Sequence, residues 1–255
     1  MHPLLTVVHV GQHALPLGSY GAFLCVAIAV AAWSALRAAH ALRLDLGAAI
    51  AAIGVVTASA FAGGLALHAL VQWTRLGSLS AALAQPGLTI AGALPAGVVG
   101  LAWSARALQL PALRWTERAL PGLLLALAIG RIGCLLGGCC YGTPSALPWS
   151  VRYVHPLAPA AVLDVTRHPT PLYEALCALG LAAALLIVRR GTPSQRVGAS
   201  LFGYASARSL LELVRGDQVR GVWPSGVSTA QLVCAAAVVA WLALTWSARS
   251  SGDGV

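Results

Sequence analysis

Residues 119–137 read ALPGLLLALAIGRIGCLLG, an apolar run that contains a single charged residue, Arg131. At about 1.5 Å per residue, an α-helix of this length spans about 28 Å, close to the thickness of the hydrocarbon core of a bilayer. A run this long with so few charges is typical of a transmembrane helix. We therefore expect this stretch to cross a membrane and to carry one guanidinium group within it.

The composition extends this interpretation to the whole chain. Hydrophobic residues make up 58% of the 255 residues, charged residues 9%, and the mean hydropathy is +0.80. A water-soluble domain of this size cannot bury so large an apolar fraction, so lipid must be the solvent for much of the surface. No long polar linker divides the sequence, which predicts a single polytopic membrane domain over residues 1–255.

The net charge of +9 raises the question of a nucleic-acid partner. All of the basic residues are arginines, and they are scattered between apolar runs instead of being clustered with aromatic residues. Nucleic-acid-binding surfaces concentrate their positive charge on one face or along one helix. We therefore expect no nucleic-acid partner, and the lipid bilayer is the expected surrounding.

The apolar runs predict an all-α integral membrane protein of about seven transmembrane helices. The predicted spans are residues 16–36, 46–72, 87–105, 119–137, 171–188, 197–214 and 228–247. The connections after the first, third and fifth spans are rich in arginine, and by the positive-inside rule they face the cytoplasm. The chain is then a multi-pass protein of the bacterial inner (plasma) membrane, with a periplasmic N-terminus and a cytoplasmic C-terminus. Residues 138–170, which are rich in proline, form a small periplasmic head segment between the fourth and fifth helices.

Ionisable side chains within the spans converge on the outer leaflet. Arg131 lies about 9 Å below the outer end of the fourth span, and Arg208 lies at a similar depth in the sixth. Glu212 and Arg215 follow Arg208 at positions i+4 and i+7, so the three share one face of a helix. Glu174 enters from the same side in the fifth span. A structural ion pair is one interpretation, but an excess of guanidinium groups in a region of low dielectric constant favours a site for a phospholipid phosphate.

The order of motifs along the chain resembles that of the prolipoprotein diacylglyceryl transferases. Residues 130–142, GRIGCLLGGCCYG, are similar to the family signature built around Gly-Arg-x-Gly-Asn-Phe. Residues 168–174, HPTPLYE, are similar to the family's His-Pro-Ser-Gln-Leu-Tyr-Glu. The spacing of five further residues also matches the family: Tyr204, Arg208, Glu212, Arg215 and Asp217. Matches in the same order over nearly the whole chain are far more specific than any one motif.

This resemblance implies a reaction and a set of site residues. Family members transfer the diacylglyceryl group of phosphatidylglycerol to the lipobox Cys of a prolipoprotein signal peptide, so these two molecules are the expected substrates. Arg131 and Arg208 match the family's essential arginines and would hold the phosphate, while Glu212 would orient Arg208. The matching positions also imply six substrate-binding residues: Tyr20, Gly142, His168, Tyr173, Glu174 and Arg215.

The chain departs from the family at several positions that handle the acceptor thiol. Cys134 and Cys139 stand where the signature has Asn and Glu, and Ala91 stands where the family has a His that is a proposed base. His68, near the outer end of the second span, is a candidate substitute base, although a lone His in an apolar helix is more often a packed residue. Cys139 is a second candidate, if Arg131 lowers the pKa of its thiol.

Other interpretations of the cysteines and of the chain remain open. Cys139 and Cys140 could be a structural pair or a disulfide, and together with Cys134 and either His155 or His168 they could bind zinc. Because the spacing is not a standard one for zinc, we expect no metal and no cofactor. The chain could also be a non-catalytic phospholipid-binding protein derived from this fold, or a transferase with a different acceptor.

Overall fold

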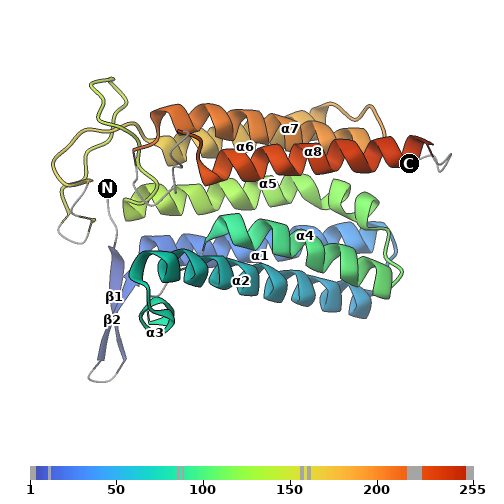
Figure 1. Ribbon diagram of the computed structural model, residues 1–255, viewed down its shortest axis with the longest axis horizontal. Helices are drawn as coiled ribbons and strands as arrows, with labels where there is room; N and C mark the ends of the chain where they lie inside the picture. The colour runs from blue at the N-terminus through green and yellow to red at the C-terminus, as the bar shows by residue number, and fades with distance from the viewer. Residues whose placement is uncertain are drawn as a thin grey trace. The chain divides into compact units, whose positions relative to one another are not determined.

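The computed structural model describes residues 4–10, 13–84, 87, 89–155, 158–159, 162–216 and 226–250 (Figure 1). Asp217 lies outside these residues. The described chain is mainly helical, and its elements run in this order: β1 (Leu4–Val10), β2 (His13–Gly18), α1 (Ser19–Ala41), α2 (Leu46–Leu76), α3 (Leu79–Leu83), α4 (Ile90–Ala107), α5 (Ala112–Gly137), α6 (Thr170–Ile187), α7 (Pro193–Leu211), the 3₁₀ helix η2 (Glu212–Val214) and α8 (Thr229–Ser250).

The long helices fall close to the predicted spans. Among the described residues, α1, α2, α5 and α6 each contain a stretch long and apolar enough to cross a bilayer, and α8 contains a shorter apolar stretch over Thr229–Ala243. The protein is therefore a helical membrane protein. The predicted start of the first span at residue 16 was wrong, because Pro16 pairs with Val7 in the antiparallel β1–β2 hairpin and α1 begins only at Ser19.

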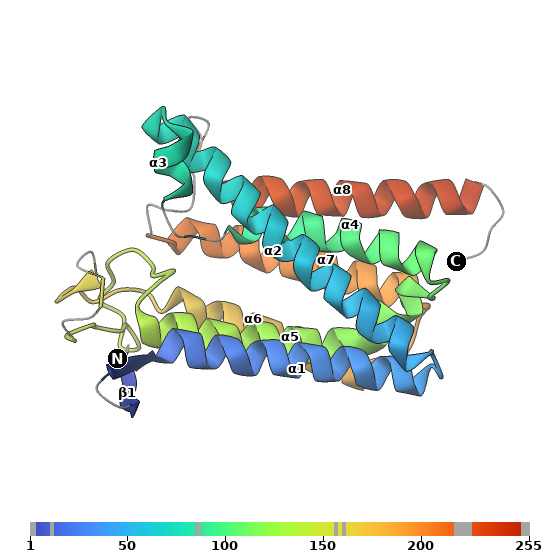
Figure 2. The ribbon, with the colours of Figure 1, turned by 90° about the horizontal axis from the view of Figure 1, so that it is seen from below.

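The chain divides into two compact units, with boundaries that fall inside α1 and α5. The first unit comprises Met1–Ser34 and Ala119–Val255, and the second comprises Ala35–Arg118. In the first unit, α6 packs against α5 and α7, and α8 packs against α7 (Figures 1 and 2). This unit contains all of the charged positions of the expected site except His68.

Small residues allow the helices of the first unit to approach one another closely. Ala175, Ala178 and Ala182 of α6 form a buried cluster with Leu124 and Ala128 of α5. In a bilayer such packing replaces the hydrophobic effect as a source of helix association, because lipid tails are as apolar as the side chains. The α5–α6 pair is thus held at short range, which allows Arg131 of α5 to contact Glu174 of α6.

The close approach of α1 to α5 depends on Gly133, and this gives a prediction. A Cβ atom on Gly133 would lie 2.8 Å from Cβ of Phe23. We expect Gly133→Ala to lower the free energy of unfolding by about 1–3 kcal/mol, because the added methyl group overpacks the interface. Gly180→Ala in α6 is the matched control, since a Cβ there meets nothing within 4 Å. Thermal unfolding in detergent measures both variants, and equal midpoints would contradict the proposed packing.

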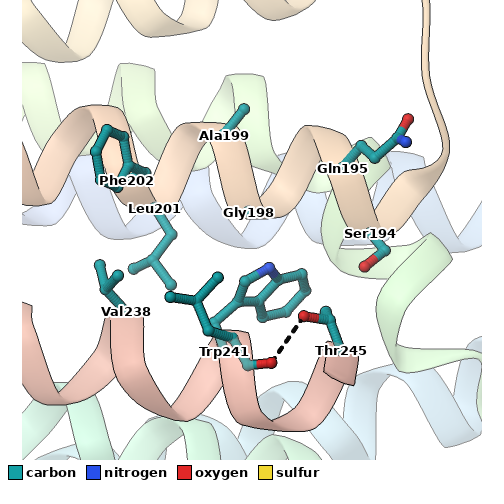
Figure 3. A pocket seen from close by; sticks show the side chains of 10 residues that line it. Ser194, Gln195, Gly198, Ala199, Leu201, Phe202, Val238, Trp241 and Thr245 are labelled. Carbon is teal, nitrogen blue, oxygen red and sulfur yellow. Dashed lines mark hydrogen bonds between the residues drawn. The ribbon is translucent and has the colours of Figure 1, made fainter. Parts of the chain in front are cut away.

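A groove between α7 and α8 has a volume of about 410 Å³ (Figure 3). Phe202 and Leu201 line it from α7, and Val238 and Trp241 line it from α8. The indole of Trp241 lies directly against Gly198. Apolar lining of this kind is ordinary for neighbouring helices in a membrane, and the groove contains none of the charged residues of the expected site.

The segment between α5 and α6 folds back on itself with a small core of its own. Tyr153, Ala158 and Val162 form a buried cluster. The hydroxyl of Tyr153 donates a hydrogen bond of 2.7 Å to the carbonyl of Leu135 at the end of α5. Burial raises the pKa of this phenol, so it remains a hydrogen-bond donor. The segment is thereby anchored to the helix end that carries Arg131.

The second unit is built on the packing of α2 against α4. Gly63 and Gly92 bring the two backbones together, since a Cβ on Gly63 would lie 2.7 Å from the carbonyl oxygen of Gly92. Asp45 caps the start of α2 by accepting a hydrogen bond of 2.7 Å from the backbone N–H of Ala48. The unit is thus a helix pair in which small residues again set the spacing.

Candidate functional site

Glu174 is the centre of the buried charged site in the first unit. It lies in the first turns of α6, and its side chain is 5% exposed. Its Oε1 atom lies 2.9 Å from a terminal guanidinium nitrogen of Arg131 on α5 and 3.9 Å from Nε of Arg208 on α7. The hydroxyl of Tyr204 donates a hydrogen bond of 2.6 Å to the same oxygen. This carboxylate of α6 therefore joins side chains from two other helices, α5 and α7.

Glu212 forms an ion pair with Nη1 of Arg208, whereas Glu174 lies nearer to Nε of the same guanidinium. The Arg208–Glu212 pair has the spacing i, i+4, where α7 gives way to η2. Arg215 lies on the same carboxylate, with 3.8 Å between its Nη1 and Oε1 of Glu212. Burial removes water from each charge, so that its protein partners must stabilise it. The ion pairs therefore hold these side chains in defined orientations.

Arg131 keeps a hydrogen-bond donor that its ion pair with Glu174 does not use. The ion pairs join three guanidinium groups, those of Arg131, Arg208 and Arg215, to the two carboxylates of Glu174 and Glu212. Arg131 is buried, and its Nε–H has no hydrogen-bond partner among the described residues. An arginine carries five N–H donors, so Arg131 retains a donor for an anionic ligand while Glu174 keeps its guanidinium oriented.

Gly142 lies where three backbone segments meet beside this set. Its N–H donates a hydrogen bond of 3.0 Å to the carbonyl of His168, and the next residue, Thr143, donates one of 2.9 Å to the carbonyl of Val214. A Cβ atom on Gly142 would lie 2.7 Å from the carbonyl oxygen of His168 and 2.8 Å from that of Val214. Only glycine fits here, so the segment after α5 is bound tightly to the segments before α6 and after η2.

Comparisons with known proteins decide the family to which this site belongs. The family model described as prolipoprotein diacylglyceryl transferase matches residues 7–247. A protein of Dehalococcoides mccartyi named phosphatidylglycerol–prolipoprotein diacylglyceryl transferase is 31% identical over 235 residues, which is 89% of each chain. The chain belongs to the prolipoprotein diacylglyceryl transferase family.

Two further relatives match over shorter lengths. Proteins with the same name from Frankia alni and Clostridium tetani are 38% and 33% identical over 165 and 149 residues. These alignments cover 61% and 58% of this chain, and 42% and 58% of the two relatives. The chain thus matches less than two thirds of the length of these two transferases.

The motifs shared with the prolipoprotein diacylglyceryl transferases meet in space as expected. Arg131, Arg208, Glu212, Glu174 and Arg215 lie in one network. The structure adds Tyr204, which sequence reasoning placed in a motif without assigning it to the site. Its spacing of four residues from Arg208 puts both on one helix face, and that signal could have identified it.

His168 and Tyr173 form a second polar group at the start of α6. Nδ1 of His168 lies 3.3 Å from the hydroxyl of Tyr173, and that hydroxyl accepts a hydrogen bond of 2.7 Å from the indole N–H of Trp149. The hydroxyl of Tyr173 thus links the indole of Trp149 to the imidazole of His168. Trp149 was not among the expected site residues, and the structure assigns it to this group.

The cysteines lie differently from the expectation. Arg131 contacts Cys140, with 3.6 Å between Nη1 and Sγ, whereas Sγ of Cys139 donates to the carbonyl of Cys134 at 3.7 Å. Hydrogen bonds with Cys134 and Cys140, together with burial, raise the pKa of Cys139. Hydrogen bonds from the neighbouring thiols and the charges of Arg215 and Arg131 lower the pKa of Cys140. The expectation that Arg131 lowers the pKa of Cys139 is therefore wrong, because the guanidinium of Arg131 contacts the thiol of Cys140.

The backbone after α5 explains this exchange. Gly138 and Cys140 both adopt left-handed conformations, with φ of 77° and 58°. Cys140 is not a glycine, so its conformation costs about 1–3 kcal/mol. The two turns direct both Cys139 and Cys140 back towards Cys134, and none of the chain's six cysteines, all of them among the described residues, forms a disulfide.

The remaining expected site residues are His68 and Tyr20. His68 lies in α2 of the second unit, where its ring is in close contact with Gly87. Its Nε2 atom is buried and has no hydrogen-bond partner among the described residues. Tyr20 lies in the first turn of α1 in the first unit, beside α5, where a Cβ on Gly137 would lie 3.3 Å from Cβ of Tyr20. Tyr20 is 45% exposed.

Proposed function

We propose that this chain transfers the diacylglyceryl group of phosphatidylglycerol to the lipobox cysteine of a prolipoprotein signal peptide. The observation that carries the proposal is the buried network of Arg131, Glu174, Arg208 and Glu212, in which the Nε–H of Arg131 has no hydrogen-bond partner among the described residues. The names of the relatives support the same reaction. In this reaction the acceptor sulfur attacks a glycerol carbon of the diacylglyceryl group, the carbon–oxygen bond to the phosphate breaks, and the electron pair leaves with glycerol phosphate.

Arg131 and Arg208 would stabilise this leaving group. Negative charge accumulates on the phosphate as the carbon–oxygen bond breaks, and donors fixed before the reaction stabilise that charge without reorganising. Glu174 lies between the two arginines and would keep their remaining N–H groups directed at the phosphate, with Glu212 orienting Arg208. Lipobox thiols have pKa values above neutrality, so the reaction also needs a group that removes the acceptor proton.

The other matched residues would bind the two substrates around this centre. Tyr20 at the start of α1 is exposed beside the end of α5. His168 and Tyr173 offer polar groups at the start of α6. Gly142 joins the segments that carry His168 and Arg215. Tyr20, His168 and Tyr173 would therefore contact the headgroup or the signal peptide. Gly142 would allow the backbone of its own segment to lie close to the segments of His168 and Arg215.

We further propose that the chain acts as one polytopic domain of about seven transmembrane helices in the bacterial inner membrane. The arginine asymmetry of its connections supports a periplasmic N-terminus and a cytoplasmic C-terminus. Residues 138–170 would then form the periplasmic head, and the arginine network would face the outer leaflet. This placement suits an enzyme whose acceptor is a secreted lipoprotein precursor.

The topology gives a prediction that is independent of the chemistry. Ala146 and Arg190 are both exposed, and they lie in the segments before and after α6. A membrane-impermeant maleimide added to intact spheroplasts should label an Ala146→Cys protein, and it should label an Arg190→Cys protein only after the membrane is opened. The parent chain controls for its own cysteines. The reverse labelling pattern would place the site on the inner leaflet and contradict the proposal.

Complementation tests the proposed function directly. A strain depleted of its own diacylglyceryl transferase should regain growth and lipoprotein maturation when this chain is expressed. The decisive assay uses labelled phosphatidylglycerol and a lipobox peptide with the purified protein. Binding of phosphatidylglycerol without transfer to the peptide would instead favour the non-catalytic lipid-binding alternative, and transfer to a different thiol would favour another acceptor.

A further inference from the structure

Three cysteine sulfurs gather at the end of α5, beside the arginine network. The Sγ atoms of Cys134, Cys139 and Cys140 all lie within 4.8 Å of one another. Cys134 is buried, and the other two are partly exposed. Three thiolates around one zinc ion at about 2.3 Å would be separated by about 3.8 Å, so small side-chain rotations would bring these sulfurs into place.

We propose that Cys134, Cys139 and Cys140 bind a thiophilic divalent ion of the Zn²⁺ class. Thiolates are soft ligands that favour such ions over Mg²⁺ or Ca²⁺. The sequence spacing alone did not predict this, because C-x₄-C-C is not a standard zinc motif. The left-handed conformations of Gly138 and Cys140 turn the chain so that Cys139 and Cys140 approach Cys134. Sequence spacing does not reveal these turns.

Local charges favour this site. Binding releases three thiol protons to solvent, and a divalent ion with three thiolates carries a net charge of −1. The guanidinium of Arg131, 3.6 Å from Sγ of Cys140, offsets this charge. Arg131 also contacts Glu174, so the metal site and the phosphate clamp share one side chain. No described carboxylate or imidazole belongs to the cluster, which leaves a fourth coordination position open.

The open position suits the acceptor thiol, a step that rests on the proposed function. The lipobox thiol would displace a metal-bound water and release its proton to solvent, because a thiol that coordinates a metal ion loses its proton. Its sulfur would then attack the glycerol carbon, and glycerol phosphate would leave. A metal ion would thus do the work of a base, in a chain that has Ala91 in place of the family's proposed base.

Metal content of the purified full-length chain tests the site without relying on activity. After equilibration with Zn²⁺ and removal of free ion, the parent should retain a single equivalent. Equilibration with Cd²⁺ should give a thiolate charge-transfer band in the ultraviolet. Cys134→Ser, Cys139→Ser and Cys140→Ser should each lose the stoichiometric ion. Cys177→Ser and Cys25→Ser, which lie outside the cluster, are matched controls and should retain it.

A second measurement needs no variant. In the parent chain, Zn²⁺ should protect Cys139 and Cys140 from alkylation by maleimide. A parent chain that binds no ion, ion binding that survives all three cluster substitutions, or a disulfide within the cluster of the isolated protein would overturn the site.

The transfer assay then tests the second step separately. Stripping the ion should abolish transfer and adding Zn²⁺ should restore it. Unchanged transfer after stripping would overturn the role at the acceptor thiol. A chain that binds the ion through these cysteines but transfers no diacylglyceryl group would support the metal site and refute the proposed function.

Discussion

Replacing Arg131 with Gln should lower the rate of diacylglyceryl transfer by about 10²- to 10³-fold, the loss seen when one preorganised donor to a developing oxyanion is removed. Arg131 is buried, and its Nε–H has no partner among the described residues, so it can donate to a phosphate oxygen. Glutamine keeps much of the side-chain volume but lacks the positive charge. The measurement is the initial rate with labelled phosphatidylglycerol and a lipobox peptide. Arg208→Gln should show a loss of the same order, because both guanidinium groups contact Glu174.

Two comparisons separate the clamp from general effects. Arg131→Lys should retain more activity than Arg131→Gln if charge matters most, and equal losses would show that the planar guanidinium is required. Arg152→Gln is the matched control, since Arg152 is paired with Asp164 on an exposed surface, 3.0 Å away. Arg152→Gln should leave the rate of diacylglyceryl transfer unchanged. Full activity in both Arg131→Gln and Arg208→Gln proteins would refute the role of the arginines as a phosphate clamp.

The sequence was sufficient to locate the charged network, for a physical reason. Ionisable side chains are costly within apolar helices, so Arg131, Arg208 and Glu212 stood out against their surroundings. Helical spacing then placed Arg208 and Glu212 on one face, and the structure pairs them. The central role of Glu174 was not predictable, because it depends on how α5, α6 and α7 pack, which spacing along one helix does not determine.

The cysteines show a different limit of sequence reasoning. The prediction about Cys139 assumed that the chain after α5 continues in an ordinary conformation. A left-handed φ at Cys140, a residue type that seldom adopts one, exchanges the places of the two thiols. The β1–β2 hairpin escaped notice in the same way, since the apolar residues before Ser19 merge with the helical run that follows. Local backbone turns, and not the apolar pattern, decide both features.

Replacing Glu174 with Ala should lower the free energy of unfolding by about 3–5 kcal/mol, the usual cost of removing one partner of a buried ion pair. The loss is this large because the opposite charge remains buried without compensation. Glu174 contacts Arg131 and Arg208, and it accepts the hydrogen bond of Tyr204. Unfolding in detergent micelles measures the change. Asp164→Asn is the control, because Asn tolerates the left-handed φ of 60° at this position. The exposed pair of Asp164 with Arg152 should contribute no more than about 1 kcal/mol.

Further variants separate the charge of Glu174 from its hydrogen bond. Tyr204→Phe removes only the hydroxyl that donates to the carboxylate, which should cost about 1.5–3 kcal/mol because the acceptor is charged. Adding Arg131→Met to Glu174→Ala removes the uncompensated charge along with its partner, so the double variant should be more stable than Glu174→Ala alone. If the double variant instead loses the sum of the two single effects, Arg131 and Glu174 do not interact energetically. The carboxylate would then not hold the arginine in place, and the fixed orientation on which the phosphate clamp depends would have to come from another group.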